Sequence, residues 1–113
     1  MLAAQFRLRD RTRLNTTIKR GRRAGRRALV VHYLPSDANG QDPARVAFAV
    51  SRAVGGSVVR HRVTRRLRHV VMTHIDALPP GCSMVVRALP PAADASSADL
   101  DRELSVLIPR VVG

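Results

Sequence analysis

The 113-residue sequence is poor in several residue types on which small domains commonly rely. It has one cysteine, Cys82, no tryptophan, and only three aromatic side chains, Phe6, Tyr33 and Phe48. A single cysteine excludes a disulfide framework and a cysteine zinc site, and its apolar neighbours predict a buried, unreactive thiol. No apolar run is long enough for a signal peptide or a membrane span, so we expect a cytoplasmic protein without a membrane partner.

Acidic residues are also scarce, with 8 against 20 basic residues, which gives a net charge of +12 and a pI near 11.9. A charge of this size repels itself in a folded domain, and the common compensating partner is nucleic acid. All basic residues except Lys19 are arginine, whose guanidinium group favours bidentate phosphate contacts. A genomic bias towards arginine codons would give the same count, so the placement of the arginines is more informative than their number.

The residue pattern predicts a single α+β domain over residues 1–113, in which helices pack on a sheet as a two-layer sandwich. The expected elements are, in order, a first helix at 6–20, a basic linker at 20–27, strands within 27–51, a basic helix at 56–78, a strand at 82–89 and a C-terminal helix at 97–109. The connection at 35–43 is short and polar, so the apolar runs 28–34 and 45–51 are expected to be antiparallel neighbours. Ser96 and Asp99 predict a capping box at the start of the last helix.

Candidate catalytic groups form no recognisable constellation in the sequence. The eight carboxylates are scattered, mostly over turns and helix ends, whereas two-metal nuclease chemistry needs carboxylates that converge on the ions. His69 and His74 are five residues apart and so do not form the i,i+4 pair of a zinc site. His74 is expected to be a hydrogen-bonded residue at the edge of the core. We therefore assign no catalytic and no metal-binding residue to this chain.

The most informative segment is RHRVTRRLR at 60–68, which has five arginines within the expected basic helix. A solvated charged face is the plain interpretation of such a run. Three features oppose it: no acidic residue lies between Arg52 and Asp76, the helix is otherwise amphipathic, and a glycine pair precedes it. These features favour a rigid phosphate-binding surface. Because a strand precedes the helix, structured RNA is favoured over DNA bound by a helix-turn-helix unit.

The segment RVAFAVSRAVGGSVVRHRVTRRLR at 45–68 resembles the signature of the protein subunit of bacterial ribonuclease P. The positions in register with that signature, or one step beside it, are Arg45, Val46, Val50, Ser51, Arg52, Val54, Gly55, Val58, Arg60, Arg62, Arg65, Arg66 and Arg68. The order and spacing of the elements also match over about residues 7–110. The chain departs from the pattern at His61, which replaces an asparagine, and in the first helix, where Leu14 and Ile18 replace aromatic residues.

The resemblance implies an αβββαβα fold with a four-stranded sheet and a left-handed crossover through the basic helix. It also implies that a catalytic RNA subunit, with Mg²⁺, removes the 5′ leader from precursor tRNA. One protein would bind each RNA, without an obligate protein partner. The residues expected to contact that RNA are Arg52, Arg60, His61, Arg62, Arg65, Arg66 and Arg68. Those expected to line a leader cleft between the first helix and the sheet are Arg9, Arg11, Leu14, Ile18 and His32.

Two other interpretations stay open from the residues alone. A general basic RNA-binding or ribosome-associated protein would present the same charge, and a stand-alone metal nuclease is a third interpretation. Because the expected leader cleft lacks its aromatic residues, base stacking is reduced there. We therefore expect a leader interaction that depends on the arginines near the first helix, Arg7, Arg9, Arg11 and Arg13, and that weakens steeply with salt.

Overall fold

The computed structural model describes residues 2–36 and 42–113. Its elements follow the order αβββαβα. They are α1 (Arg11–Arg20), β1 (Arg22–Gly25), β2 (Leu29–Leu34), β3 (Arg45–Ala49), α2 (Ser57–His74), β4 (Ser83–Ala88) and α3 (Ser97–Val112), with short 3₁₀ turns at Ala4–Phe6, Ile75–Ala77 and Pro90–Asp94. The expected α+β class is confirmed. No helix in these two ranges is both long and apolar enough to cross a membrane.

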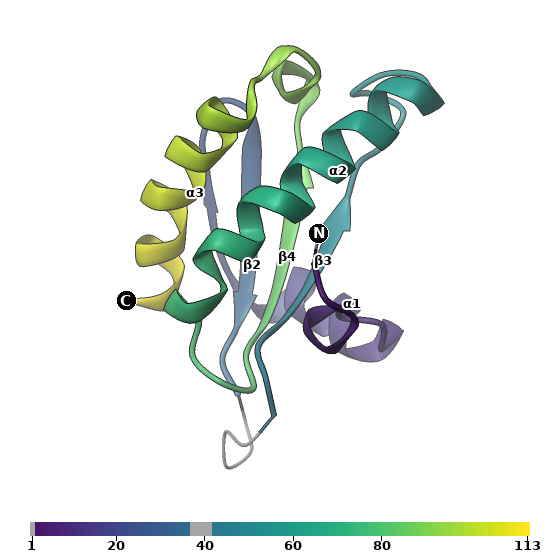
Figure 1. The fold of residues 1–113 in the computed structure, drawn as a ribbon. Helices are drawn as coiled ribbons and strands as arrows, with labels where there is room; N and C mark the ends of the chain where they lie inside the picture. The colour runs from purple at the N-terminus through teal and green to yellow at the C-terminus, as the bar shows by residue number, and fades with distance from the viewer. Residues whose placement is uncertain (1, 37–41) are drawn as a thin grey trace.

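The four strands form one mixed sheet in the order β1-β2-β4-β3. β2 pairs antiparallel with both β1 and β4, whereas β3 pairs parallel with β4. The chain passes from β3 to β4 through α2, which lies in front of the sheet in Figure 1. In this view β4 lies to the left of β3. The crossover is therefore left-handed, the rare form that the resemblance implied.

The arrangement of the strands corrects two expectations. The apolar runs 28–34 and 45–51 are not antiparallel neighbours, because β4 lies between β2 and β3; residues 37–41 of the turn expected between them lie outside the described residues. The segment 20–27 is not a linker, since β1 lies within it. β1 is an edge strand with mostly exposed side chains, so it lacks the apolar alternation that identifies a strand in a sequence.

The first helix begins later than the expected range of 6–20. Asp10 caps α1, since its side chain accepts hydrogen bonds from the backbone N–H groups of Thr12 (2.9 Å) and Arg13 (3.3 Å). Between the 3₁₀ turn at Ala4–Phe6 and this cap, the chain forms a bridge to β3, in which the N–H of Leu8 donates to the carbonyl of Val46 at 2.9 Å. The N-terminal segment therefore covers the free edge of β3 instead of extending the helix.

α2 and α3 pack side by side on one face of the sheet and enclose the main core (Figure 1). α2 is amphipathic, as expected, and buries Val63, Leu67, Val70 and Val71 on one side. α3 buries Leu100, Leu104, Leu107, Ile108 and Val111 in the same way. Because both helices bury a continuous stripe, their remaining faces are fixed towards solvent.

α1 packs on the opposite face of the sheet, behind the strands in Figure 1. A smaller apolar cluster of Leu8, Ala47 and Val85 lies there, with Leu14 of α1 packed against it. Arg13 adds a polar link, because its Nε donates to Ser83 Oγ on β4 at 2.6 Å. The face is thus only partly covered, by one short helix.

His32 is a buried polar residue on this second face, with 3% of its surface exposed. Neither ring nitrogen has a hydrogen-bond partner among the described residues. Burial lowers the pKa of His32 below its ordinary value of 6.5, and the positive charges of Arg87 and Arg23 lower it further. The imidazole is therefore neutral in the folded protein near pH 7.

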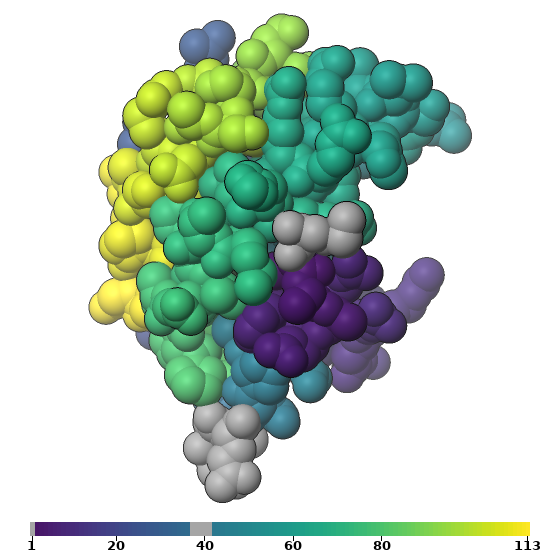
Figure 2. Space-filling view, in the orientation of Figure 1, coloured from purple at the N-terminus to yellow at the C-terminus, as the bar shows by residue number. Residues whose placement is uncertain are grey.

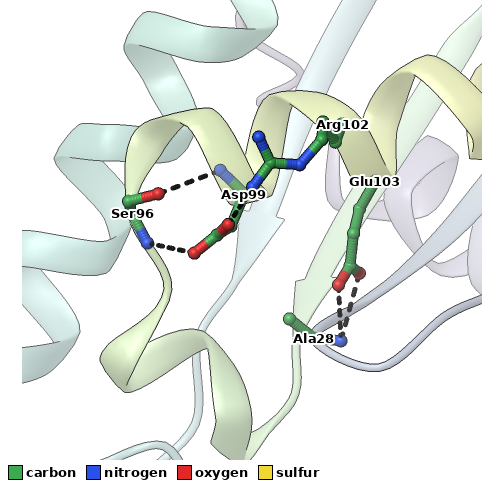
Figure 3. A network of polar contacts seen from close by, with 5 residues as sticks. All are labelled: Ala28, Ser96, Asp99, Arg102 and Glu103. Atoms are coloured by element: carbon green, nitrogen blue, oxygen red, sulfur yellow. Dashed lines mark hydrogen bonds and ion pairs between the residues drawn. The ribbon is translucent and has the colours of Figure 1, made fainter.

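α3 is joined to the turn between β1 and β2 by the carboxylate of Glu103 (Figure 3). This carboxylate accepts hydrogen bonds from the backbone N–H of Ala28 at 3.1 and 3.2 Å and from that of Leu29 at 3.1 Å. At the start of the same helix, Ser96 and Asp99 form the expected capping box, and Arg102 pairs with Asp99 (Figure 3). The acidic residues of α3 are thus used to hold the fold.

Replacing Glu103 tests this link. Glu103→Ala leaves the N–H groups of Ala28 and Leu29 without their acceptor, and we expect it to lower the free energy of unfolding by about 2 kcal/mol. Glu103→Gln keeps an acceptor oxygen and is expected to lose less. Urea denaturation measures both values, and equal stability of Glu103→Ala and the wild type would contradict the role given to this carboxylate.

The buried His32 predicts a pH-dependent stability. Because its folded pKa lies below 6.5, the unfolded chain binds the proton first, so stability is complete above pH 6.5 and is lost as the pH falls below that value. His32→Leu removes this titration, and we expect its free energy of unfolding to decline less than that of the wild type between about pH 7 and pH 5. Parallel pH profiles for the two proteins would show that His32 is not responsible.

Candidate nucleic-acid interface

The packing of α2 determines which of its basic residues face solvent. With Val63, Leu67, Val70 and Val71 in the core, His61, Arg65 and His69 are exposed. Arg60, Arg62, Arg66 and Arg68 are half-buried at the edges of the helix, and Arg52 is exposed in the turn before it. The expected basic helix therefore presents a rigid surface of one charge sign.

The two glycines before α2 have different roles. A Cβ atom on Gly55 would lie 2.8 Å from Cγ1 and 2.9 Å from Cβ of Val59, so glycine is required for this close approach. A Cβ atom on Gly56 would meet nothing within 4 Å. Only the first glycine is therefore needed to bring the chain tightly into the first turn of α2.

Two shallow hollows follow one another along the solvent side of α2. The first has a volume of about 530 Å³ and is lined by Ser57, Val58, His61, Arg62 and Arg65. The second has a volume of about 390 Å³ and is lined by His61, Arg65, Arg66, Arg68, His69 and Ser97. We call His61, Arg65, Arg68 and His69 the outer stripe of α2. Because His61 and Arg65 line both hollows, the stripe is one continuous basic surface.

Arg62 and Arg66 also have a structural role that the sequence did not indicate. Arg62 Nη2 donates to the carbonyl of Ala93 at 3.2 Å, and Arg66 Nη1 donates to that of Ala95 at 2.8 Å. Both acceptors belong to the turn that leads from β4 into α3. These two arginines therefore tie α2 to that turn, and only part of each guanidinium group is available to a ligand.

A groove on the other side of α2 joins this helix to the N-terminal segment. It has a volume of about 290 Å³ and is lined by Arg7, Leu8, Arg9, Leu14, Val46, Ala47, Phe48, Thr64 and Arg68. On the right of Figure 2 the space-filling surface is hollowed between the teal residues at the start of α2 and the purple N-terminal segment. Arg68 belongs to both this groove and the outer stripe, so the two surfaces are contiguous.

The five residues expected to line a leader cleft are not all brought together. Arg9 and Leu14 line the groove, and Arg11 is exposed in the first turn of α1. Ile18 is 37% exposed but does not line the groove. The position of His32 corrects its expected role, because a side chain that is 3% exposed on the central strand β2 offers almost no surface to a ligand.

Phe48 is a candidate contact that the sequence reasoning missed. It is half-buried against the core and also lines the groove, where it is the only aromatic residue. In the sequence, the pattern around Phe48 indicates only an ordinary strand residue that faces the core. Its partial exposure follows from the position of β3 at the edge of the sheet, which depends on the strand order and not on the local pattern.

The acidic residues of α3 have partners within the fold. Asp99 is in the capping box, Glu103 accepts from the β1–β2 turn, and Asp101 contacts His74 Nε2 at 2.6 Å. This contact confirms that His74 is a hydrogen-bonded residue at the edge of the core. No cluster of three or more potential metal ligands occurs in the described parts of the chain.

Comparison with known sequences gives matches over nearly the full chain. The family model for ribonuclease P matches residues 2–112. The ribonuclease P protein component of a Nocardioides species is 53% identical over 111 residues, which cover 98% of this chain and 95% of that protein. The protein component of Streptomyces bikiniensis is 50% identical over 121 residues, which cover 100% of this chain and 97% of that protein.

Solved structures share the same fold at lower identity. The RNase P protein of Staphylococcus aureus has a TM-score of 0.78 and 22% identity, with 96% of this chain and 98% of that chain covered. The RNase P protein of Thermotoga maritima, solved with 1-(4-fluorophenyl)-2-thiourea, has a TM-score of 0.78 and 23% identity, with coverages of 93% and 99%. The fold is therefore common to proteins whose sequences differ at most positions.

The resemblance seen in residues 45–68 extends to the whole chain, in sequence and in fold. The function of this chain is accordingly that of the protein component of a ribonucleoprotein endoribonuclease. That enzyme processes the 5′ end of tRNA, and its catalytic groups lie on the RNA subunit. With a family match over 2–112 and relatives about half identical over their full length, this chain belongs to the ribonuclease P protein family.

Proposed function

We propose that the protein binds the catalytic RNA subunit, one protein to each RNA, through the outer stripe of α2. The observation that carries this proposal is the uncompensated charge of that stripe. His61 and Arg65 line two adjoining hollows, and Arg68 lines the second of them, on a helix whose opposite face is fixed in the core. Such a surface matches a folded RNA backbone in charge, and it needs little rearrangement on binding.

We propose that the groove beside α2 receives the 5′ leader of precursor tRNA. Arg7, Arg9 and Arg68 supply positive charge along it, while Leu14 and Phe48 supply apolar surface. Arginines neutralise the phosphates of a single strand, and Phe48 offers a ring edge or face to a base. Since Arg68 belongs to both surfaces, the leader would pass directly beside the RNA subunit.

We propose that Mg²⁺ is held by the RNA subunit. The carboxylates of α3 are occupied by backbone, histidine and arginine partners, so they are poor candidates for ligands. The protein would act by electrostatics: its arginines reduce the repulsion between the leader and the RNA subunit, so that less Mg²⁺ is needed. The expected cytoplasmic location fits a protein whose partners are RNAs.

A general RNA-binding or ribosome-associated role is the alternative function. The outer stripe alone is compatible with it, because phosphate contacts carry little sequence information. The groove beside α2 favours the processing role, since it adds to the outer stripe a second, contiguous surface that combines arginines with apolar residues. The two functions differ in one property, which is whether the effect of the protein depends on a 5′ leader.

Reconstitution tests the proposed function directly. The purified protein is added to a bacterial ribonuclease P RNA and precursor tRNA at a low Mg²⁺ concentration, at which the RNA alone is inactive. We expect cleavage at the mature 5′ end only when both components are present. Failure to rescue cleavage would contradict the proposal, and cleavage by the protein without RNA would show that the catalytic groups are on the protein.

The outer stripe predicts a specific effect of Arg65→Ala on RNA affinity. Arg65 lines both hollows, and its loss removes about one phosphate contact, so the slope of log Kd against log salt should decrease by about 1. Arg110→Ala removes an equal charge from an exposed position at the end of α3 and serves as the control. Filter binding over a range of KCl measures both, and equal slopes for the two variants would contradict the assignment.

The groove predicts that leader binding weakens steeply with salt. The affinity of the holoenzyme for precursor tRNA is compared with that for mature tRNA, and the difference is the contribution of the leader. We expect this contribution to fall between low and moderate salt, and to fall less steeply in Arg9→Ala. A leader contribution that is unchanged by salt would show that the arginines of the groove do not contact it.

A further inference from the structure

Val58 is the most exposed large apolar residue in the described parts of the chain. It is 78% exposed, whereas Ile18, the other exposed large apolar residue in those parts, is 37% exposed. Its neighbour Val59 packs against the core and occupies the space that a Cβ on Gly55 would need, so the first turn of α2 is held without Val58. The packing of the fold gives no reason for an apolar side chain at position 58.

The surroundings of Val58 are polar and basic. It lines the hollow of about 530 Å³ together with Ser57, His61, Arg62 and Arg65. Residues 58, 61, 62 and 65 recur at helical spacing and so share one face of α2. The first turns of α2 extend past the end of β3 (Figure 1), which leaves this face open to a large partner. Val58 is therefore a single apolar contact within a positively charged rim.

We propose that Val58 packs against the base of an unpaired nucleotide in the catalytic RNA, while His61 and Arg65 contact the adjoining phosphates. This inference rests on the proposed function, in which α2 docks on that RNA. The basic residues around Val58 favour binding of a polyanion. The apolar side chain of Val58 itself favours contact with an uncharged part of that polyanion. In paired RNA, the deep groove of the A-form helix excludes side chains. The faces of bases are therefore accessible only where nucleotides are unpaired.

The two kinds of contact have different salt dependence, which makes the inference testable. Loss of a phosphate contact reduces the salt slope of binding, whereas loss of an apolar contact weakens binding equally at every salt concentration. Val58→Thr keeps the shape of the side chain and makes it polar. We expect it to raise Kd for a bacterial ribonuclease P RNA by roughly three- to tenfold across the whole salt range, with an unchanged slope.

Two variants serve as controls in this titration. Val106→Thr introduces the same change on α3, far along the chain from the outer stripe, and is expected to bind RNA like the wild type. Arg65→Ala is expected to change the slope. If Val58→Thr binds as tightly as Val106→Thr, or if it changes the slope, the inference is wrong. If the wild type itself does not bind the RNA, the proposed function fails instead.

Crosslinking identifies what lies against position 58. The chain has one cysteine, Cys82, which is 1% exposed and whose pKa burial raises to about 11, so it reacts poorly with thiol reagents. A benzophenone attached to Val58→Cys therefore reports on position 58 alone. We expect a crosslink to an unpaired nucleotide of the RNA subunit. A crosslink confined to paired nucleotides, or to a second protein chain in place of RNA, would overturn the proposal.

Discussion

The packing of one side of α2 into the core is the interaction on which the rest of the structure depends. Val63, Leu67, Val70 and Val71 belong to the core that the sheet, α2 and α3 enclose, so the helix cannot rotate without exposing them. This burial holds the arginines of the opposite side in a fixed geometry. The left-handed crossover then places the same helix beside the N-terminal segment, so one helix borders two surfaces.

The distribution of acidic residues complements this arrangement. The carboxylates of α3 cap the helix, contact His74, and accept hydrogen bonds from the β1–β2 turn (Figure 3). They stabilise the fold, while no acidic residue is among the described side chains that line the two hollows of the outer stripe. The positive field of a chain with a net charge of +12 is therefore not cancelled within those hollows.

Much of the fold follows from the sequence, because the elements with regular apolar periodicity are recognisable in it. The basic helix with its amphipathic character, the C-terminal helix and the capping box at Ser96 were all predicted from the sequence. β1 was missed because an exposed edge strand has no apolar alternation. The strand order was also misjudged, since β2 and β3 are close in sequence but separated by β4, a pairing that depends on the crossover.

The candidate site was predictable where it depends on one helix and not where it depends on tertiary contacts. The exposure of His61 and Arg65 follows from helical periodicity. The bonds from Arg62 and Arg66 to the carbonyls of Ala93 and Ala95 involve residues about thirty positions away, so no local pattern shows them. Similarly, His32 was expected to line a cleft. It is buried because it lies on a central strand, which no local pattern shows.

The central claim is that the placement of the arginines, and not their number, creates the RNA-binding surface. It is tested most directly by two triple variants that remove the same charge. One replaces Arg52, Arg65 and Arg68 by glutamine, and the other replaces the exposed Arg26, Arg27 and Arg110. Affinity for the catalytic RNA is measured for both at one salt concentration. The account predicts a large loss for the first variant and a small loss for the second, and equal losses would contradict it.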